Sequence, residues 1–203
     1  MSISNLFPTP VYKFSLAGHE TYKKRLVKVL EQKFKDDPDS KAGFAKLCDT
    51  WQCHHSEVGV DLTDIYTEIM AEAMKYINQL TKHTYYTIAD SWFNVHTPDM
   101  YQEVHEHTPS FISGNYYIQF DPEKDKSIIF INENKTFLYS SWAMNLPITK
   151  PELFSKYQLP DVKEGDVVLF PSTLNHMVAK SEPHSQLRIT NSFNIMPISP
   201  THK

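Results

Sequence analysis

The sequence predicts a mainly β fold, a β-sandwich or jelly roll, with helices packed on its outside. Two amphipathic helical patterns lie within about residues 1–82, and short β-rich segments follow from residue 84 onward. Aromatic residues make up 13% of the chain, which suits a β-rich core around an enclosed pocket. Helices followed by a series of short strands are typical of helices that cover one layer of a sandwich.

Two helices are expected after an extended lead-in. Prolines in residues 6–12 bias the residues before them toward extended backbone. In residues 19–35, apolar side chains recur at every fourth position between lysines, which predicts an amphipathic helix. In residues 62–80 a clearer apolar face repeats at helical spacing, and Asp61 or Thr63 could cap its start.

About eight short strands are expected in the rest of the chain. Each is a run of β-branched and aromatic residues, and turns that carry Pro, Asn, Asp or Gly separate the runs. The expected strands are 84–88, 92–95, 111–112, 115–120, 127–131, 136–140, 166–170 and 186–196. We predict a single domain, 1–203, with a helical support over about 1–82 and a jelly-roll core over about 83–197.

Composition narrows the function classes. A net charge of −4 and a pI near 6.2 exclude a general nucleic-acid-binding surface. No run approaches the roughly 20 apolar residues of a membrane span, and residues 1–16 lack the features of a secretory signal. The only cysteines, Cys48 and Cys53, cannot form a disulfide framework. We therefore expect a cytoplasmic protein in reducing surroundings. The sequence leaves open whether the protein forms homo-oligomers.

The motif His105-Glu106-His107 is the strongest functional signal. In a strand, residues two apart face the same side, so both imidazoles can reach one point. Imidazole is the commonest protein ligand of divalent transition metals. His176, after a turn at 171–173, offers a third ligand, and Glu103 shares the strand face of the histidine pair. A lone histidine among apolar residues is usually hydrogen-bonded core, but three in this arrangement favour a metal site.

Arg188 alternates with apolar residues in the last expected strand. Its face could be a solvated outer surface. If the face instead points inward, the guanidinium must be paired, because an unpaired buried charge costs several kcal/mol. The carboxylate of a small molecule would satisfy Arg188, with the Thr190 hydroxyl assisting.

A set of motifs occurs in a fixed order along the chain. The set consists of residues 6–10, Trp92-Phe93-Asn94, His105-Glu106-His107-Thr108-Pro109-Ser110, Ser113-Gly114-Asn115-Tyr116-Tyr117, residues 165–172, His176 and residues 188–194. This order resembles a family of iron(II)- and 2-oxoglutarate-dependent oxygenases that is common in bacteria and phages and related to prolyl hydroxylases. The resemblance covers nearly the whole chain.

The resemblance implies a double-stranded β-helix (a jelly roll, cupin-like) that holds iron at its open end. His105 would be the first ligand and His176 the distal one. Most such oxygenases have a carboxylate two residues after the first histidine, where this chain has His107. We predict that His107 completes a three-histidine site, with Glu103 as the alternative third ligand.

The same resemblance implies Fe(II) and 2-oxoglutarate as cofactors. Arg188 would bind the far carboxylate of 2-oxoglutarate, Tyr116 and Thr190 would donate hydrogen bonds to it, and Asn94 would touch the co-substrate. The implied activity is a dioxygenase that hydroxylates a small molecule or a protein residue, such as a prolyl residue, and releases succinate and CO2.

Two other functions fit parts of the pattern. A cupin-type dioxygenase could use three histidines without 2-oxoglutarate, but residues 108–114 lack the glutamate expected of that class, and Arg188 would need another anion. A non-catalytic jelly-roll binding or structural module would explain the missing carboxylate at His107. The group Cys48, Cys53, His54 and His55 matches no known zinc spacing. We expect it to line a loop near the pocket mouth, with the two histidines diverging.

Overall fold

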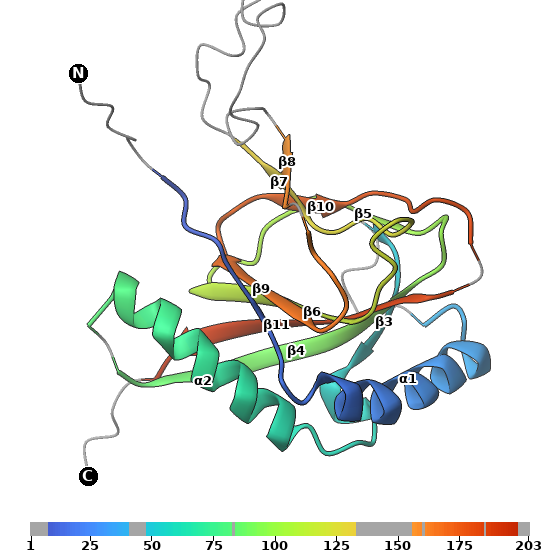
Figure 1. Cartoon of the computed structure of the whole chain (residues 1–203), viewed down its shortest axis with the longest axis horizontal. Coiled ribbons are helices and arrows are strands. Elements are labelled where there is room, and N and C mark those ends of the chain that lie inside the picture. Colours follow the sequence, from blue (N-terminus) through green and yellow to red (C-terminus); the bar gives the residue numbers. More distant parts are fainter. Residues whose placement is uncertain are drawn as a thin grey trace, which may run out of the picture.

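The computed structural model of the chain describes residues 8–40, 48–82, 84–132, 156–159, 161–184 and 186–198. Its strands form two antiparallel sheets that face each other, with two helices on the far face of the larger one (Figure 1). The mainly β jelly roll predicted from the sequence is confirmed. No helix in the described ranges is long and apolar enough to cross a lipid bilayer.

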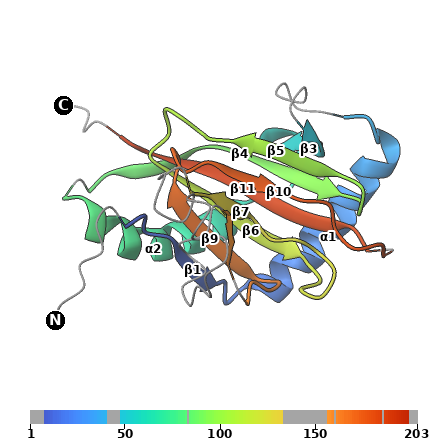
Figure 2. The same ribbon diagram turned by 90° about the horizontal axis from the view of Figure 1, so that it is seen from above.

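The larger sheet has the strand order β1-β9-β6-β11-β4-β3. From above, β4, β11 and β6 run side by side through the middle of the molecule (Figure 2). The bounds of its strands are β1 Tyr12–Ser15, β3 Trp51–His54, β4 Tyr86–His96, β6 Ile112–Gln119, β9 Asp166–Pro171 and β11 Arg188–Pro197.

The smaller sheet has the order β2-β5-β10-β7-β8. Its strands are β2 Cys48–Asp49, β5 Tyr101–His105, β7 Ile129–Ile131, β8 Lys156–Gln158 and β10 His176–Val178. The helices are α1 His19–Asp36 and α2 Thr63–Leu80, and a 3-10 turn, η2, covers His55–Glu57 between β3 and α2.

Strand alternation divides the buried residues between two layers. Tyr116 and Phe193 face the helices, in a core that α1 and α2 complete with the residues their periodicity predicted, such as Leu26 and Ile69. Tyr117, Phe130, Val168 and Phe170 instead pack between the two sheets. Even-numbered residues of β11 up to Asn194 and of β4 from Trp92 onward, and odd-numbered residues of β6, therefore point into the space between the sheets.

Both predicted helices are confirmed to within a residue or so, whereas several strands differ from expectation. The segments 84–88 and 92–95 belong to one strand, β4, and 111–112 joins 115–120 in β6. Four short strands that the sequence patterns did not predict form the edges of the two sheets. They are β1, β2, β3 and β8. The part of the chain expected to be a helical support thus adds strands to both sheets. The expected strand 136–140 lies outside the described residues.

Gly114 on β6 lies beneath side chains of both neighbouring strands. A Cβ atom at this position would meet the ring of Phe193 on β11 and the side chain of Leu169 on β9. We expect Gly114→Ala to lower the free energy of unfolding by about 1–3 kcal/mol, because extra volume strains a packed core. Urea denaturation measures the change, and Gly114→Ala/Phe193→Leu should recover part of it. An unchanged midpoint for Gly114→Ala would show that the ring moves aside freely.

Candidate metal centre

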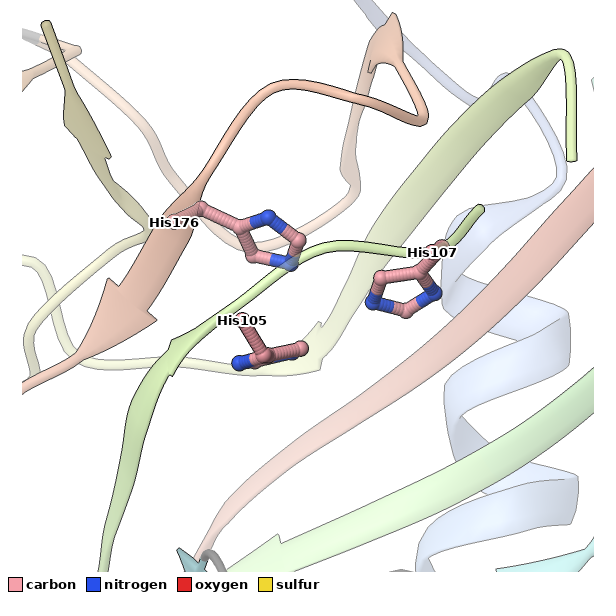
Figure 3. A group of neighbouring side chains, drawn as sticks. All are labelled: His105, His107 and His176. Carbon is pink, nitrogen blue, oxygen red and sulfur yellow. The ribbon is translucent and has the colours of Figure 1, made fainter. Parts of the chain in front are cut away.

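Three histidines from the smaller sheet and the loop after β5 converge between the sheets. His105 ends β5 and His176 begins β10, directly opposite it in register, while His107 lies two residues past β5. Their ligand nitrogens all lie within 4.8 Å of one another, and the three rings surround a common space (Figure 3). The His105 and His176 ring centroids are 4.3 Å apart, and His107 is 5.0 Å from His176. The three residues singled out by spacing are brought together.

Hydrogen bonds fix which nitrogen of each ring is free. The Nδ1 atom of His105 lies 2.6 Å from the Glu103 carbonyl oxygen, and that of His176 lies 2.9 Å from the Leu174 carbonyl oxygen. A carbonyl only accepts, so both Nδ1 atoms carry the proton and both Nε2 atoms keep a lone pair. His107 Nδ1 lies 3.1 Å from Asn194 Oδ1 in the same way. Such outer partners are typical of metal-binding histidines.

The surroundings keep these imidazoles neutral. Burial, with the neighbouring histidines adding to it, lowers the pKa of His107 to about 4 and that of His176 to about 3. Burial also lowers the pKa of His105. The Trp92 ring stacks on His107 at 5.3 Å, and Phe170 meets His176 edge-on at 4.8 Å. Near neutral pH the site therefore offers lone pairs rather than cations.

No carboxylate joins the three imidazoles among the described residues. Glu103, the alternative third ligand, has an exposed side chain. Glu106 accepts a hydrogen bond from Thr108 on the exposed side of the loop. His107 Nε2, by contrast, is buried without a hydrogen-bond partner, as expected of a nitrogen that awaits a cation. The donor set fits a divalent metal of the kind that imidazole binds, with three neutral nitrogen ligands.

Arg188 begins β11 and is buried between the sheets, with only 1% of its surface exposed. Its Nε and Nη2 atoms have no hydrogen-bond partner, and its guanidinium lies 5.6 Å from the centroid of the Tyr117 ring. Burial lowers the pKa of Arg188, which Tyr117 and Asp125 oppose. The sequence left an outer and an inner face open, and the structure places Arg188 on the inner one.

Other unpaired polar atoms lie on the same inner faces. Thr190 Oγ1, Asn115 Oδ1 and His96 Nε2 are buried without partners. His96 lies opposite Arg188 in the β4–β11 register, and burial, with Arg188 adding to it, holds its pKa well below the usual range. Arg188 and the Thr190 hydroxyl can donate to an anion, and His96 Nε2 can do so in the tautomer that carries its proton there, whereas Asn115 Oδ1 only accepts. Because residues two apart in a strand share a face, the sequence could have placed His96 on the same face as Trp92 and Asn94.

The structure does not bring Tyr116 together with Arg188. The Tyr116 hydroxyl lies 2.8 Å from His19 Nδ1, on the helix side of the larger sheet. Tyr117 takes the expected place, because a shift of one residue in a strand reverses its face. Asn94 lies on the inner face, where its Oδ1 accepts from Gln52 Nε2 at 2.9 Å and its Nδ2 donates to Ser192 Oγ at 2.9 Å.

Solved structures share this fold. A prolyl-4-hydroxylase from Pseudomonas putida is similar over 94% of each chain, with 10% identity and a TM-score of 0.62. A prolyl hydroxylase from Trichoplax adhaerens, in complex with a hypoxia inducible factor peptide fragment, has 9% identity and a TM-score of 0.58 over 92% of this chain and 83% of that one. The alpha ketoglutarate dependent carbocyclase SnoK of nogalamycin biosynthesis has 12% identity and a TM-score of 0.63 over 93% and 79%. These identities show the fold alone.

A family comparison adds the enzyme class. No curated protein sequence matches this chain. A family model described as "Putative 2OG-Fe(II) oxygenase" matches residues 90–194, just over half of the chain, and the match includes His105, His107, His176 and Arg188. Fe(II) and 2-oxoglutarate are the cofactors that this family implies. The chain belongs to the 2OG-Fe(II) oxygenase family, a class of enzymes.

Proposed function

We propose that this protein is an iron(II)- and 2-oxoglutarate-dependent dioxygenase that hydroxylates its substrate. In this proposal His105, His107 and His176 hold the iron through their Nε2 atoms. The observation that carries the proposal is Arg188, a buried cation with two unpaired nitrogens on the inner face of the sheet that also carries Asn194, the partner of His107. Bound together, the metal and 2-oxoglutarate supply the oxidation of a C–H bond by O2, with release of succinate and CO2.

The far carboxylate of 2-oxoglutarate is assigned to Arg188. A buried guanidinium needs an anionic partner, and a carboxylate can accept two parallel N–H bonds from it. Thr190, two residues along the same face of β11, has an unpaired hydroxyl that can donate to the same anion. We assign Tyr117 to this subsite in place of Tyr116, because its ring lies against Arg188. Neutral His96 can complete the subsite.

The chain's own residues position the metal ligands and exclude water. Asn194 accepts from both His107 Nδ1 and Ser113 Oγ, so β11 and β6 together fix the His107 ring. Trp92 and Phe170 cover the His107 and His176 rings with apolar surface, which limits the access of water. Asn94 is saturated by Gln52, Gln102 and Ser192, and we assign it to holding β3, β5 and β11 together beside the pocket.

A prolyl or other protein residue is the substrate that we propose. Support comes from the similar folds of two prolyl hydroxylases. A small molecule is the alternative, because the carbocyclase of nogalamycin biosynthesis has a similar fold as well. A three-histidine dioxygenase that does not use 2-oxoglutarate would leave Arg188 without its anion.

Turnover of 2-oxoglutarate tests the proposed function. We expect the protein with Fe(II) to convert 2-oxoglutarate into succinate slowly without a substrate, and His176→Ala to abolish iron binding at the three-histidine centre and succinate formation. Mass spectrometry of succinate and calorimetry of metal binding give the two readouts. Iron binding with no affinity for 2-oxoglutarate would support the cupin-type alternative. Absence of iron binding would leave only a non-catalytic module.

Arg188→Ala separates the co-substrate from the metal. We expect this variant to bind Fe(II) normally and 2-oxoglutarate roughly ten- to a hundredfold more weakly, since a hydrogen bond to a charged group contributes about 1.5–3 kcal/mol. Arg25→Ala is the matched control, because Arg25 pairs with Asp64 on the outside of the helices. Tight 2-oxoglutarate binding by Arg188→Ala, measured anaerobically, would contradict the assignment.

The third iron ligand can be identified by exchanging carboxylate and imidazole. His107→Ala should weaken Fe(II) binding roughly ten- to a hundredfold or more, because even outer partners of metal ligands have effects of that size. His107→Asp should retain Fe(II), since it restores the common set of two histidines and one carboxylate. Glu103→Gln, which neutralises the exposed alternative, should change nothing. Normal iron affinity in His107→Ala, or its loss in Glu103→Gln, would exclude His107 as the ligand.

A further inference from the structure

A second group of metal-binding side chains lies outside the three-histidine centre. It consists of His54 at the end of β3, His55 at the start of η2 and Asp90 on β4. One ligand atom from each of the three lies within 4.8 Å of the other two. β3 is the outermost strand of the larger sheet, so this group sits at the sheet edge. None of its members belongs to the iron site proposed above.

The two histidines converge because the chain bends between them. Consecutive residues of a strand would point to opposite faces, and from the sequence we expected His54 and His55 to diverge. β3 instead ends at His54, which caps the 3-10 turn that His55 begins. The two ring centroids are therefore only 4.2 Å apart. The expectation of diverging rings is wrong. Cys53, one residue earlier, is buried in the core on the helix side and takes no part in the group.

Each histidine has an outer partner that can leave Nε2 free for a metal. His55 Nδ1 donates to the Ser91 carbonyl oxygen at 3.0 Å, so its Nε2 carries a lone pair. His54 Nδ1 accepts from the Ser56 backbone N–H at 3.3 Å and lies 2.7 Å from Ser56 Oγ, so the proton of His54 is on Nε2, 3.0 Å from Asp90 Oδ1. A metal at Nε2 requires this proton to move to Nδ1, where Ser56 Oγ can accept it and the hydrogen bond from the Ser56 backbone is given up. Asp90 keeps its charge in this change of tautomer.

We propose that His54, His55 and Asp90 bind a divalent transition-metal ion such as zinc. Two imidazoles and one carboxylate favour zinc, cobalt or nickel over calcium and magnesium, which prefer sets made only of oxygen. The His54 and Asp90 side chains are 43% and 52% exposed, so water can fill the remaining positions. A surface ion pair between His54 and Asp90 would by itself stabilise the fold little.

The ion would join the turn after β3 to β4 beside the iron site. His54 lies opposite Trp92 in the β3–β4 register, and Trp92 stacks on His107. His55 also lines a cavity of about 490 Å³, together with Ser91, Thr63 and Tyr66. The site therefore crosslinks the edge of the sheet that carries one wall of the metal centre.

Zinc stoichiometry tests this site separately from the oxygenase function. We expect His105→Ala/His176→Ala, which lacks the iron ligands, to bind one zinc ion by calorimetry. Adding Asp90→Asn or His55→Gln should weaken that binding roughly ten- to a hundredfold or more. Asp99→Asn, the same change in an exposed turn outside the group, should have no effect. Zinc should also shift the NMR signals of the His54 and His55 rings.

The otherwise unaltered protein gives a second reading if the double variant folds poorly. We expect it to bind two zinc ions, and its Asp90→Asn variant to bind one. Zinc stoichiometry and affinity that are the same in the unaltered protein, in Asp90→Asn and in His55→Gln would overturn the proposal. Succinate formation is measured independently, so failure of the iron-site proposal would not be mistaken for failure of this one.

Discussion

The pairing of β11 with β4 on one side and β6 on the other is the constraint on which the rest of the site depends. This register puts Arg188 opposite His96 and Thr190 opposite Asn94, and it carries Asn194 to Ser113 and His107. Because side chains alternate, a slip of one residue would turn Arg188 into the apolar helix-side core and bring Ile189 into the pocket. The helices and edge strands hold this central register. The functional groups depend on it.

The same register leaves buried polar groups unsatisfied. Arg188, Thr190, His96 and His107 each keep a buried atom without a partner, although native proteins rarely tolerate such groups. Leaving a buried donor or acceptor unpaired costs roughly 1–3 kcal/mol, and more for a charged group. These four residues line the same inner surface, where a bound metal ion and co-substrate could pair with them. Ligands that bind only the folded chain would then offset the free-energy cost of the unpaired groups. The protein is then more stable with metal and co-substrate than without.

Sequence patterns with a strong period predicted most of the fold. The four-residue spacing of Leu26 and Leu30 located α1, and the His105–His107 alternation located two of the proposed metal ligands, because period and spacing are local properties. Sequence patterns failed where a shift of one residue decides which side chain faces the pocket. Tyr116 and Tyr117 are chemically alike, and only the strand register tells which of them faces Arg188. The His54–His55 bend likewise depends on where β3 ends, and strand ends are poorly marked in a sequence.

Charge distinguishes the two metal sites that we propose. Three neutral imidazoles leave a dication uncompensated between the sheets, where burial already penalises charge on each ring. A dianionic co-substrate would supply the missing charge, so iron and 2-oxoglutarate should each raise the affinity of the other by the same factor. The edge site has its own carboxylate in Asp90 and open contact with water. Asp90 offsets one of the two positive charges of the ion and water solvates the other, so this ion should bind independently of 2-oxoglutarate.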